Sequence, residues 1–561
     1  MIPWLTIAIA LPAVGAALVW ALPRTAAKAS PARAARTAEA GGAAEAPAGG
    51  GGAATAVRPA TTAAGGGSAE TAKRITLGFS IATLLVVAAM ALRFDTSRAA
   101  SLQFEEVHPW IQRFGVHYAV GVDGIALVLI LMSAVLVPLV VLAAWNEHDD
   151  RFDGGRGYFA LILVLEAMMI GVFAATDVFL FYVFFEAMLI PVYFMIGRYG
   201  RGDGRSAAAV KFLLYSLAGG LVMLVSVIGV YVIGGSFLWT DLVGEGSALA
   251  AVDPATARWL FLGFFIAFAI KAPMWPVHTW LPSAAGASRP GTAVLLVGVL
   301  DKVGTYGMMR YCLELFPAAV SWFVWPVVGL SLVSIIYGAI LAIGQNDMMR
   351  LVAYTSVSHF GFITLGIFAL TAQGQAGAAL YMVNHGFATG ALFLIVGFLV
   401  ARRGSSLISD YGGVQRVAPK LAGVFLVTGL AGLALPGLAP FVSEFLVFVG
   451  VYAFHPAPAV VAAVGVVLAA LYILWMYQRT MNGPTKEGLT GLRDLSARET
   501  WAVAPLLALI LVLGLYPQPV LDVINPAVER TVGIGSGTAD AAADGGSEGA
   551  SGTQEEEGDA E

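Results

Sequence analysis

Several ionisable side chains fall in the middle of long apolar segments of this sequence. Glu186 is the ninth of eighteen residues in VFLFYVFFEAMLIPVYFM (178–195). A charge at the centre of a bilayer costs roughly 2.5–3.5 kcal/mol even on insertion scales, so such a group is normally paired, neutral or hydrated. Because a carboxyl group can take up and release a proton, we expect Glu186 to take part in proton transfer. A structural hydrogen bond between two helices is the alternative.

Lys271 occupies a similar position in FLGFFIAFAIKAPMWPVHTWLP (261–282), and two prolines interrupt the segment directly after it. A broken helix leaves free carbonyl groups and short helix ends that attract ions and water, which would give this lysine a route for proton exchange. A Glu186–Lys271 pair would let the protonation of one group alter the other, and a permanent buried ion pair is the alternative. His278, seven residues further on, is either a relay or an interfacial hydrogen-bonding group.

Three more such groups follow along the chain. Lys302 is central in AVLLVGVLDKVGTYGMM (293–309) and is expected to face the interior of a helix bundle. Asp301 precedes it and points about 100° away on a helix, so it is either a second relay group or a local counter-charge. Glu444 directly follows the proline-rich break LALPGLAPF (433–441), and Glu166 is a further carboxyl group that serves either proton transfer or packing.

His359 and His385 are also embedded in apolar segments. Histidine titrates near neutral pH, which suits proton hopping, although a single histidine on an apolar face is more often a structural residue. Because two of them lie in segments next to the broken ones, the relay and structural interpretations both stay open. Arg310 and Glu314, near the end of a segment, are expected to extend their charged ends to the membrane interface.

The composition indicates the elements that must hold these groups. Of the 561 residues, 58% are hydrophobic and 12% are charged, whereas soluble domains have about 25% charged residues. Many apolar stretches are about 20 residues long, which is enough to cross a bilayer as a helix. The alternating pattern of an outer-membrane barrel is absent. The predicted fold class is therefore an all-α polytopic membrane protein.

Other classes of function are excluded or disfavoured by what the sequence lacks. The only cysteine is Cys312, which can form no internal disulfide and cannot hold an iron–sulfur cluster with its four or so ligands. Neither a GxGxxG turn after a strand nor a GxxxxGK[ST] loop is present, so nucleotide binding is not expected. The net charge of −5 and the absence of a basic domain disfavour nucleic acid as a partner.

Fourteen transmembrane spans are predicted, and the seventh and twelfth are broken by prolines. These two spans are five apart and so run in opposite directions, which is typical of two inverted five-helix repeats with an ion site at the breaks. The repeats would comprise spans four to eight and nine to thirteen. The predicted spans are 2–22, 75–93, 122–145, 157–175, 178–197, 209–234, 258–282, 291–311, 320–343, 348–370, 376–401, 419–454, 459–479 and 500–519.

The chain divides into four predicted parts. Residues 1–23 hold the first span, which lacks a basic leader region and is expected to be retained. Residues 24–74 are rich in alanine and glycine and are predicted to be a disordered cytoplasmic loop, and 535–561 a disordered acidic tail. Residues 75–520 form the main membrane domain. Basic residues cluster in alternate loops, as in GRYGRGDGR (197–205), which places both termini on the outer face.

Five motifs together resemble the antiporter-like subunits of respiratory complex I, over nearly all of the chain outside 24–74 and the tail. In that family the ionisable residue on the second broken helix distinguishes the large subunits. In this sequence that position is Glu444, whereas subunits L and N have a lysine there. The chain also lacks the long lateral helix of subunit L. The motifs are FYVFFEAMLIPVYFMIG (181–197), KAPMWPVHTWLP (271–282), DKVGTYGMMRY (301–311), SHFGFITLG (358–366) and LPGLAPFVSEF (435–445).

The resemblance implies a proton-translocating subunit in the membrane arm of a bacterial NADH-quinone oxidoreductase, in the plasma membrane. Glu186 and Lys271 would be the switching pair, Lys302 the central relay, and Glu444 the terminal group, with the two histidines extending the path. NADH oxidation and quinone reduction would take place in other subunits, so no cofactor and no redox site are expected in this chain. Its partners would be the antiporter-like subunits L and N, smaller helical subunits, and the lipid bilayer.

Three features depart from the family pattern. The segment SAAGASRPGT (283–292) replaces a turn that usually contains an acidic residue and a histidine. Asp301 stands where an apolar residue is expected, and the 24–74 segment is atypical. Two related functions remain as alternatives on motifs alone: a subunit of a multi-component Na⁺/H⁺ antiporter, and the membrane arm of a hydrogenase-type complex.

Overall fold

The computed structural model describes residues 2–23, 67–147, 155–244 and 246–544. Within them, 13 helices are long and apolar enough to cross a membrane, and the two shorter apolar helices α18 and α19 together make one more crossing. All fourteen predicted spans are therefore present, and the chain is an all-helical polytopic membrane protein. The first half of the helices comprises α1 (Trp4–Ala21), α3 (Gly67–Ala91), α4 (Gly124–Ala144), α5 (Arg156–Ala174), α6 (Val178–Ala187), α7 (Leu189–Gly197), α8 (Arg205–Gly234), α9 (Trp239–Leu242), α10 (Pro254–Lys271), α11 (Trp280–Ala287) and α12 (Pro290–Leu295).

The second half is arranged in the same way, with long crossings and short connections. These helices are α13 (Lys302–Gly307), α14 (Pro317–Ile343), α15 (Met348–Phe368), α16 (Ala372–Arg403), α17 (Val414–Val417), α18 (Pro419–Gly432), α19 (Ala439–Phe454), α20 (Pro456–Met481), α21 (Ala497–Leu515) and α22 (Gln518–Asp544). Short 3₁₀ turns complete the helical elements at η1 (Thr96–Arg98), η2 (Gln112–Phe114) and η6 (Ile408–Asp410).

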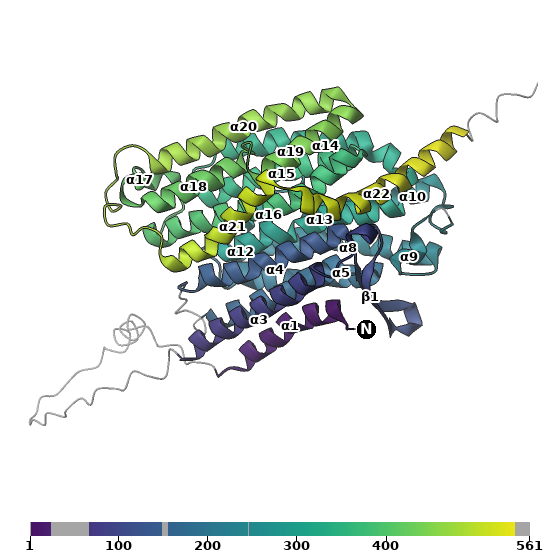
Figure 1. Ribbon diagram of the computed structural model, residues 1–561, viewed down its shortest axis with the longest axis horizontal. Coiled ribbons are helices and arrows are strands. Elements are labelled where there is room, and N and C mark those ends of the chain that lie inside the picture. Colours follow the sequence, from purple (N-terminus) through teal and green to yellow (C-terminus); the bar gives the residue numbers. More distant parts are fainter. Residues whose placement is uncertain (1, 24–66, 148–154, 245, 545–561) are drawn as a thin grey trace, which may run out of the picture.

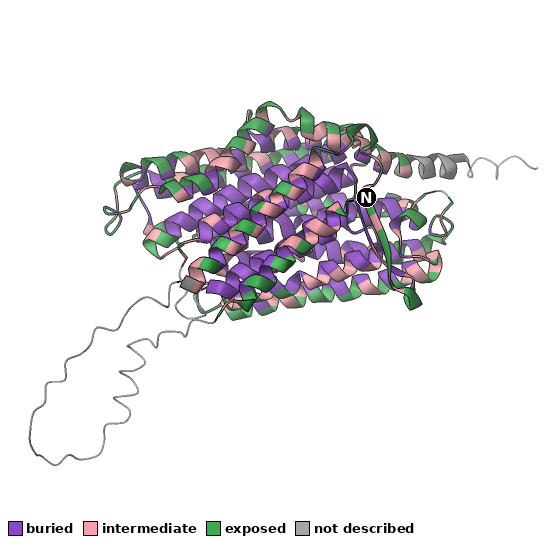
Figure 2. Ribbon diagram, turned by 60° about the horizontal axis from the view of Figure 1, so that its bottom comes forward, coloured by how far each residue is buried: buried purple, intermediate pink, exposed green. Residues whose placement is uncertain are grey.

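The helices that carry Lys302, His359 and His385 form the centre of the bundle. Over their apolar stretches, α16 and the span Pro290–Leu313 are 100% buried and α15 is 94% buried, whereas α1 and α8 are 33% buried. Figure 2 shows this as buried ribbon in the middle of the molecule, with the exposed residues around its outside. Lys302, His359 and His385 thus lie on the helices that are farthest from lipid.

Both predicted helix breaks are present. Helix α10 ends at Lys271 itself, and the carbonyl of Ile270 accepts a hydrogen bond from the indole of Trp280 at 2.9 Å. In the other half, α18 ends at Gly432 and α19 begins at Ala439. Gly437 has φ +91° between them, a backbone conformation that a helix does not adopt. The broken spans seven and twelve are therefore confirmed.

The eighth span is irregular in a way that its sequence does not reveal. Two π-helical stretches, η4 (Leu296–Leu300) and η5 (Met308–Leu313), flank the six residues of α13. The amide of Asp301 accordingly donates to the carbonyl of Leu296, five residues back, at 3.1 Å. Isolated π-helical turns often occur at functional sites, and this pair encloses Asp301 and Lys302.

A β-hairpin, which was not predicted, covers the beginning of the first helix. Strands β1 (Gln103–Ile111) and β2 (Val116–Val122) pair in antiparallel register. The carboxylate of Glu106 on β1 accepts hydrogen bonds from the amides of Leu5 and Thr6, at 3.0 and 3.3 Å. It thus satisfies donor groups that the first turn of α1 leaves free, and a carboxylate is favourable at that end of a helix.

Two predicted boundaries differ from the structure. Helix α3 begins at Gly67, inside the predicted 24–74 loop, and its first turns are held by an ion pair between Arg74 and Glu70 at 3.3 Å. Residues 24–66 lie outside the described residues, as do 545–561 of the predicted tail. Helix α22 continues to Asp544, past residue 535. The start of α1 and the end of α22 lie at the same end of the bundle, as an even number of spans requires (Figure 1).

Candidate functional site

Lys302 is fully buried at the centre of the bundle and holds two partners. Its Nζ atom donates to the carbonyl of Val297 at 2.5 Å and lies 2.7 Å from Nδ1 of His385 on α16. The same Nζ atom lies 5.2 Å from the centre of the Phe360 ring, whose face attracts a cation. The structure therefore confirms that Lys302 faces the bundle interior, and it brings Lys302 into direct contact with one predicted histidine.

The two histidines lie next to each other. The rings of His385 and His359 are 5.2 Å apart between centres, with an angle of 83° between their planes. His385 is 1% exposed and His359 is 6% exposed, so both are shielded from lipid. Nε2 of His385 and Nδ1 of His359 have no hydrogen-bond partner among the described residues. Each ring therefore keeps one nitrogen available for a proton or for a water molecule.

Two tyrosines, which sequence reasoning missed, connect the histidines to Glu444. Nε2 of His359 lies 3.3 Å from the hydroxyl of Tyr472 on α20. The ring of Tyr381 on α16 lies 6.0 Å from the ring of His359, and its hydroxyl donates to Oε2 of Glu444 at 3.0 Å. Tyr381 precedes His385 by four residues and so shares its helix face, a spacing that could have indicated its position.

The second helix break holds Glu444 in place. Glu444 lies on α19, six residues after Leu438, and is 6% exposed. Asn384 on α16 donates to the carbonyl of Ala439 at 2.8 Å and to the hydroxyl of Ser443 at 3.3 Å. Because Asn384 directly precedes His385, the same turn of α16 fixes both a histidine of the row and the first turn of the helix that carries Glu444.

At the other break, Glu186 and Lys271 are near each other without forming an ion pair within 4 Å. Nζ of Lys271 lies 4.5 Å from the centre of the Phe185 ring and has no hydrogen-bond partner in the described part of the chain. Phe185 directly precedes Glu186, so the Lys271 ammonium lies beside the turn of α6 that carries this carboxyl group. Glu186 packs against Gly220 of α8, where an added Cβ would lie 1.6 Å from its Oε1 atom. A permanent contact ion pair, the alternative from the sequence, is thus not what the structure contains.

The less certain candidates lie in different surroundings. Glu166 on α5 is fully buried, and neither carboxyl oxygen has a hydrogen-bond partner within the described residues. The ring of His278 lies 5.3 Å from the ring of Tyr337 and 6.4 Å from that of Tyr354 between centres. The structure thus places neither residue in the row that joins Lys302 to Glu444.

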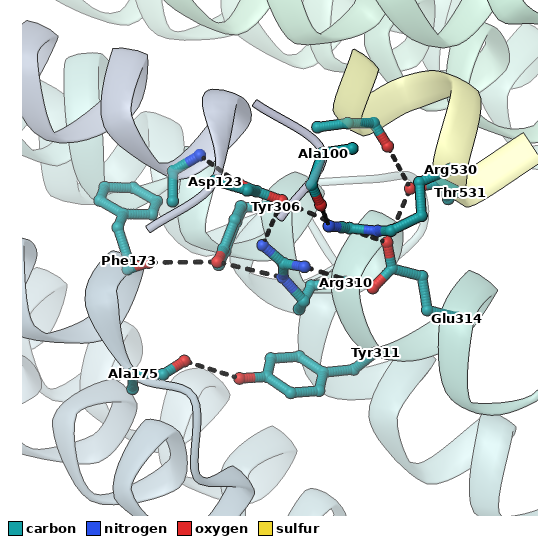
Figure 3. A network of polar contacts seen from close by, with 12 residues as sticks. Ala100, Asp123, Phe173, Ala175, Tyr306, Arg310, Tyr311, Glu314, Arg530 and Thr531 are labelled. Carbon is teal, nitrogen blue, oxygen red and sulfur yellow. Dashed lines mark hydrogen bonds and ion pairs between the residues drawn. The ribbon is translucent and has the colours of Figure 1, made fainter. Parts of the chain in front are cut away.

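A second buried polar network occupies the far end of the eighth span (Figure 3). Oδ2 of Asp123 accepts from Arg310 at 2.5 Å and from Arg530 at 3.0 Å. Glu314 accepts from Arg530 at 3.0 Å and from the Thr531 hydroxyl at 2.7 Å. Arg310 and Glu314 are 6% and 3% exposed, so the prediction that they extend to the interface is wrong. They find their counter-charges on α22 and before α4, which the sequence places far away.

The charges of this network compensate one another. Burial acts to raise the pKa of Asp123, but the guanidinium groups of Arg310 and Arg530 outweigh it, and the pKa stays below its ordinary value. Trp239 packs against both arginines: its ring centre lies 4.7 Å from Cζ of Arg310 and 5.1 Å from Cζ of Arg530. Two acids and two bases that are ion-paired in this way form a structural tie, whereas Lys302 and Glu444 of the central row have hydrogen-bond partners but no opposite charge in contact among the described residues.

Comparisons with known proteins agree with this geometry. The family model described as NADH:quinone oxidoreductase/Mrp antiporter, TM, matches residues 175–471, which include both breaks and all of the central row except Tyr472. Subunit M of NADH-quinone oxidoreductase from Mycobacterium tuberculosis (strain ATCC 25618 / H37Rv) is 53% identical over 485 residues, covering 81% of this chain and 88% of that protein. The chain belongs to the subunit M family of NADH-quinone oxidoreductase.

Other members of the subunit M family and solved structures extend the comparison. Subunit M of Rhodobacter capsulatus is 40% identical over 477 residues, covering 82% of this chain and 90% of that one. Respiratory complex I from Thermus thermophilus contains a chain with a TM-score of 0.78 and 30% identity, over 95% of this chain and 99% of that one. A chain of the Mrp complex from Dietzia has a TM-score of 0.73 at 22% identity, over 83% and 94% of the two chains, and shares the fold. Antiporter-like membrane subunits of this kind generally lack cofactors.

Proposed function

We propose that this subunit M chain translocates protons along the buried row that joins Lys302 to Glu444. As a member of its family, the chain is a proton-translocating membrane-arm subunit of complex I. The observation that carries the proposed path is the 2.7 Å contact between Lys302 Nζ and His385 Nδ1. From there, the ring of His385 lies beside that of His359, and the ring of His359 lies beside that of Tyr381. The hydroxyl of Tyr381 donates to the carboxyl group of Glu444.

The order of groups along the row suggests how a proton moves. Lys302 in its charged form donates to His385, which accepts at Nδ1 and can release a proton from Nε2 on the other side of the ring. His359 receives it and is followed by the hydroxyls of Tyr472 and Tyr381, which can donate and accept at one atom. The proton ends on Glu444, beside the second break. Water would fill the remaining steps, because the free nitrogens of the two histidines do not touch each other.

Glu186 and Lys271 are proposed to control this transfer. They lie close enough for the charge of one to act on the other. Each also has a polar atom without a hydrogen-bond partner among the described residues. Gain or loss of a proton by one group therefore changes the free-energy cost of burying the other. A charge that arrives from a neighbouring subunit would shift the pair, then the proton affinity of Lys302, and finally that of Glu444.

The remaining functional inferences follow from family membership. We propose that NADH oxidation and quinone reduction take place in other subunits, and that this chain holds no cofactor. Its partners would be the antiporter-like subunits L and N and smaller helical subunits, in a bacterial plasma membrane. The basic loops support an orientation with both termini on the outer face, because lysine and arginine are enriched on the cytoplasmic side.

The experiment that tests the proposed function compares three substitutions in the assembled complex. Glu186→Ala, Lys271→Ala and Glu444→Ala should each leave assembly intact and lower NADH-driven proton uptake into inverted membrane vesicles by about tenfold or more, because a proton-transfer group typically contributes 10²–10⁴-fold. Glu487→Gln changes an exposed carboxylate and serves as the control. Full pumping in Glu444→Ala would refute the path, and full pumping in Glu186→Ala would refute the switching pair.

A further inference from the structure

Asp301 is a fully buried acid that the proposed path does not use. It is 0% exposed, and neither of its carboxyl oxygens has a hydrogen-bond partner in the described part of the chain. It stands at the start of α13, between the two π-helical stretches of the eighth span. Burying a carboxyl group without hydrogen-bond partners costs free energy whether the group is charged or neutral. Such a group is therefore not expected in a helix whose role is only to span the membrane.

The packing of α13 places this acid beside the first broken helix. One turn after Asp301, a Cβ added to Gly304 would lie 2.5 Å from the carbonyl oxygen of Phe268 and 2.7 Å from the amide of Ala272. Helix α13 therefore touches the backbone of α10 on both sides of Lys271. Residues three apart share a helix face, so Asp301 lies on the face of α13 that meets the end of α10.

Two lysines flank Asp301. Lys302 directly follows it in the chain, and Lys271 ends the helix whose backbone α13 touches. Lys302 directs its Nζ atom away, to Val297 and His385, at 2.5 and 2.7 Å. Asp301 is thus next to Lys302 in the chain and on the face of α13 that packs against the end of α10 at Lys271, and it makes a contact ion pair with neither lysine.

We propose that Asp301 is the proton carrier that joins Lys271 to Lys302. This inference rests on the proposed function and adds a step to it. The ammonium of Lys271 gives a proton to the carboxylate of Asp301, leaving a neutral amine and a carboxylic acid. The acid then gives the proton to the neutral amine of Lys302, and the carboxylate is restored. Water between the side chains bridges both transfers, and the proton count is unchanged by the pair of steps.

The contrast with Asp123 separates a carrier from a fixed counter-charge. Asp123 is equally buried, but it is held by two arginines at 2.5 and 3.0 Å and by the amide of Ala126 at 3.0 Å. An acid that serves as a permanent counter-charge is bonded in this way, because a buried ion pair is favourable only with close geometry and further hydrogen bonds. Asp301 has none of these contacts, and its oxygens remain free to gain and lose a proton.

The test uses three substitutions in the intact complex. Asp301→Asn keeps the size of the side chain and removes its proton, Asp301→Glu keeps the acid, and Thr305→Val, one turn away, is the control for disturbing α13. Asp301→Asn should lower the pumping rate in inverted vesicles by about tenfold or more, because a proton-transfer step is lost, while Asp301→Glu restores much of it and Thr305→Val changes it little.

Infrared difference spectroscopy during NADH-driven turnover separates a carrier from a counter-charge. A carrier gives a carbonyl stretch of a protonated carboxylic acid that disappears in Asp301→Asn and shifts in Asp301→Glu, so the second variant suffices if the first does not assemble. Absence of this change, or wild-type pumping in Asp301→Asn, overturns the inference. If Lys302→Ala abolishes pumping in the same membranes, the proposed function stands when the inference about Asp301 fails.

Discussion

Lys302 and His385 are 83 positions apart in the chain, and their side-chain nitrogens lie 2.7 Å from each other in the middle of the bundle. Because both are nitrogens and each can donate or accept, one proton must lie between them for the contact to be favourable. The carbonyl of Val297 can only accept, so it holds the lysine as a donor at the same time. Either Lys302 donates to an unprotonated Nδ1, or a neutral amine accepts from Nδ1–H, and both arrangements keep one proton between the two nitrogens.

Replacing His385 by leucine should interrupt the row directly after Lys302. Leucine fills a similar volume but cannot accept a proton, so we expect NADH-driven proton uptake into inverted vesicles to fall by about tenfold or more. His455→Gln is the matched control, because this histidine is exposed and caps the start of α20. Equal pumping by His385→Leu and the wild type would contradict a path through this residue.

The two tyrosines should behave as a coupled pair. Tyr381→Phe removes the hydroxyl that donates to Glu444, and Tyr472→Phe removes the one near His359, while each ring remains. A lost hydrogen bond of this kind is worth about 1 kcal/mol, so each single substitution should slow pumping severalfold. The double substitution should slow it by less than the product of the two single effects, because both hydroxyls belong to one path between His359 and Glu444 and removing either already interrupts it. Additive effects on the logarithm of the pumping rate would argue for separate roles.

A methyl group at Gly220 should disturb the switching pair without touching its charges. In Gly220→Ala the new Cβ would lie 1.6 Å from Oε1 of Glu186, so that carboxyl must move away from its position near Lys271. We expect assembly to be retained and coupled pumping to fall severalfold. Gly423→Ala is the control, because nothing lies within 4 Å of a Cβ on that helical glycine, and alanine there should stabilise α18 by up to about 1 kcal/mol. Unchanged pumping in Gly220→Ala would mean that the position of Glu186 is not important.

Arg530 should hold α22 against the bundle through Asp123 and Glu314. Because its side chain is partly exposed, we expect Arg530→Ala to cost about 2 kcal/mol, less than a fully buried pair, and to speed hydrogen–deuterium exchange of α22 amides by ~30-fold. Mass spectrometry of peptides from the purified complex measures this exchange. Arg416→Ala, an exposed arginine on α17, is the control. The same exchange in both variants would show that the network does not anchor α22.

The same network should weaken in acid. Its arginines keep the pKa of Asp123 below the ordinary value of about 3.9, against the effect of burial. A depressed folded-state pKa stabilises the protein above the unfolded-state value, and this stabilisation is lost as the pH falls through the folded-state pKa. Protection of α22, corrected for the intrinsic exchange rate, should therefore decrease below about pH 4. Asp123→Asn should have low protection already at pH 7 and should respond less to acid.

The sequence was sufficient for the features that depend on local composition. The cost of placing charge in lipid identified Glu186, Lys302 and Glu444, and the effect of proline on helices located both breaks to within a few residues. These signals are strong because a membrane span must be apolar and continuous. A charged residue or a proline within such a span can therefore be recognised from the amino-acid sequence alone.

The missed features depend on partners that are distant in the chain. Arg310 was expected to extend towards the interface, because nothing near it in the sequence indicates that Asp123 and Arg530 meet it in the interior. Tyr381 and Tyr472 are ordinary residues of apolar helices, and only their contacts with Glu444 and His359 give them a role. The hairpin over residues 103–122 was missed because its strands lie in a connection between two strong helical signals.

The two π-helical stretches of the eighth span have a consequence for its evolution and engineering. Each behaves as a helix with one residue too many, so deleting one residue from η4 would restore regular hydrogen bonding and raise the intrinsic stability of that segment. It would also rotate everything on one side by about 100° relative to the other. Lys302 would then turn away from Val297 and His385. A regular and more stable eighth span would therefore be unable to pass protons to the central row.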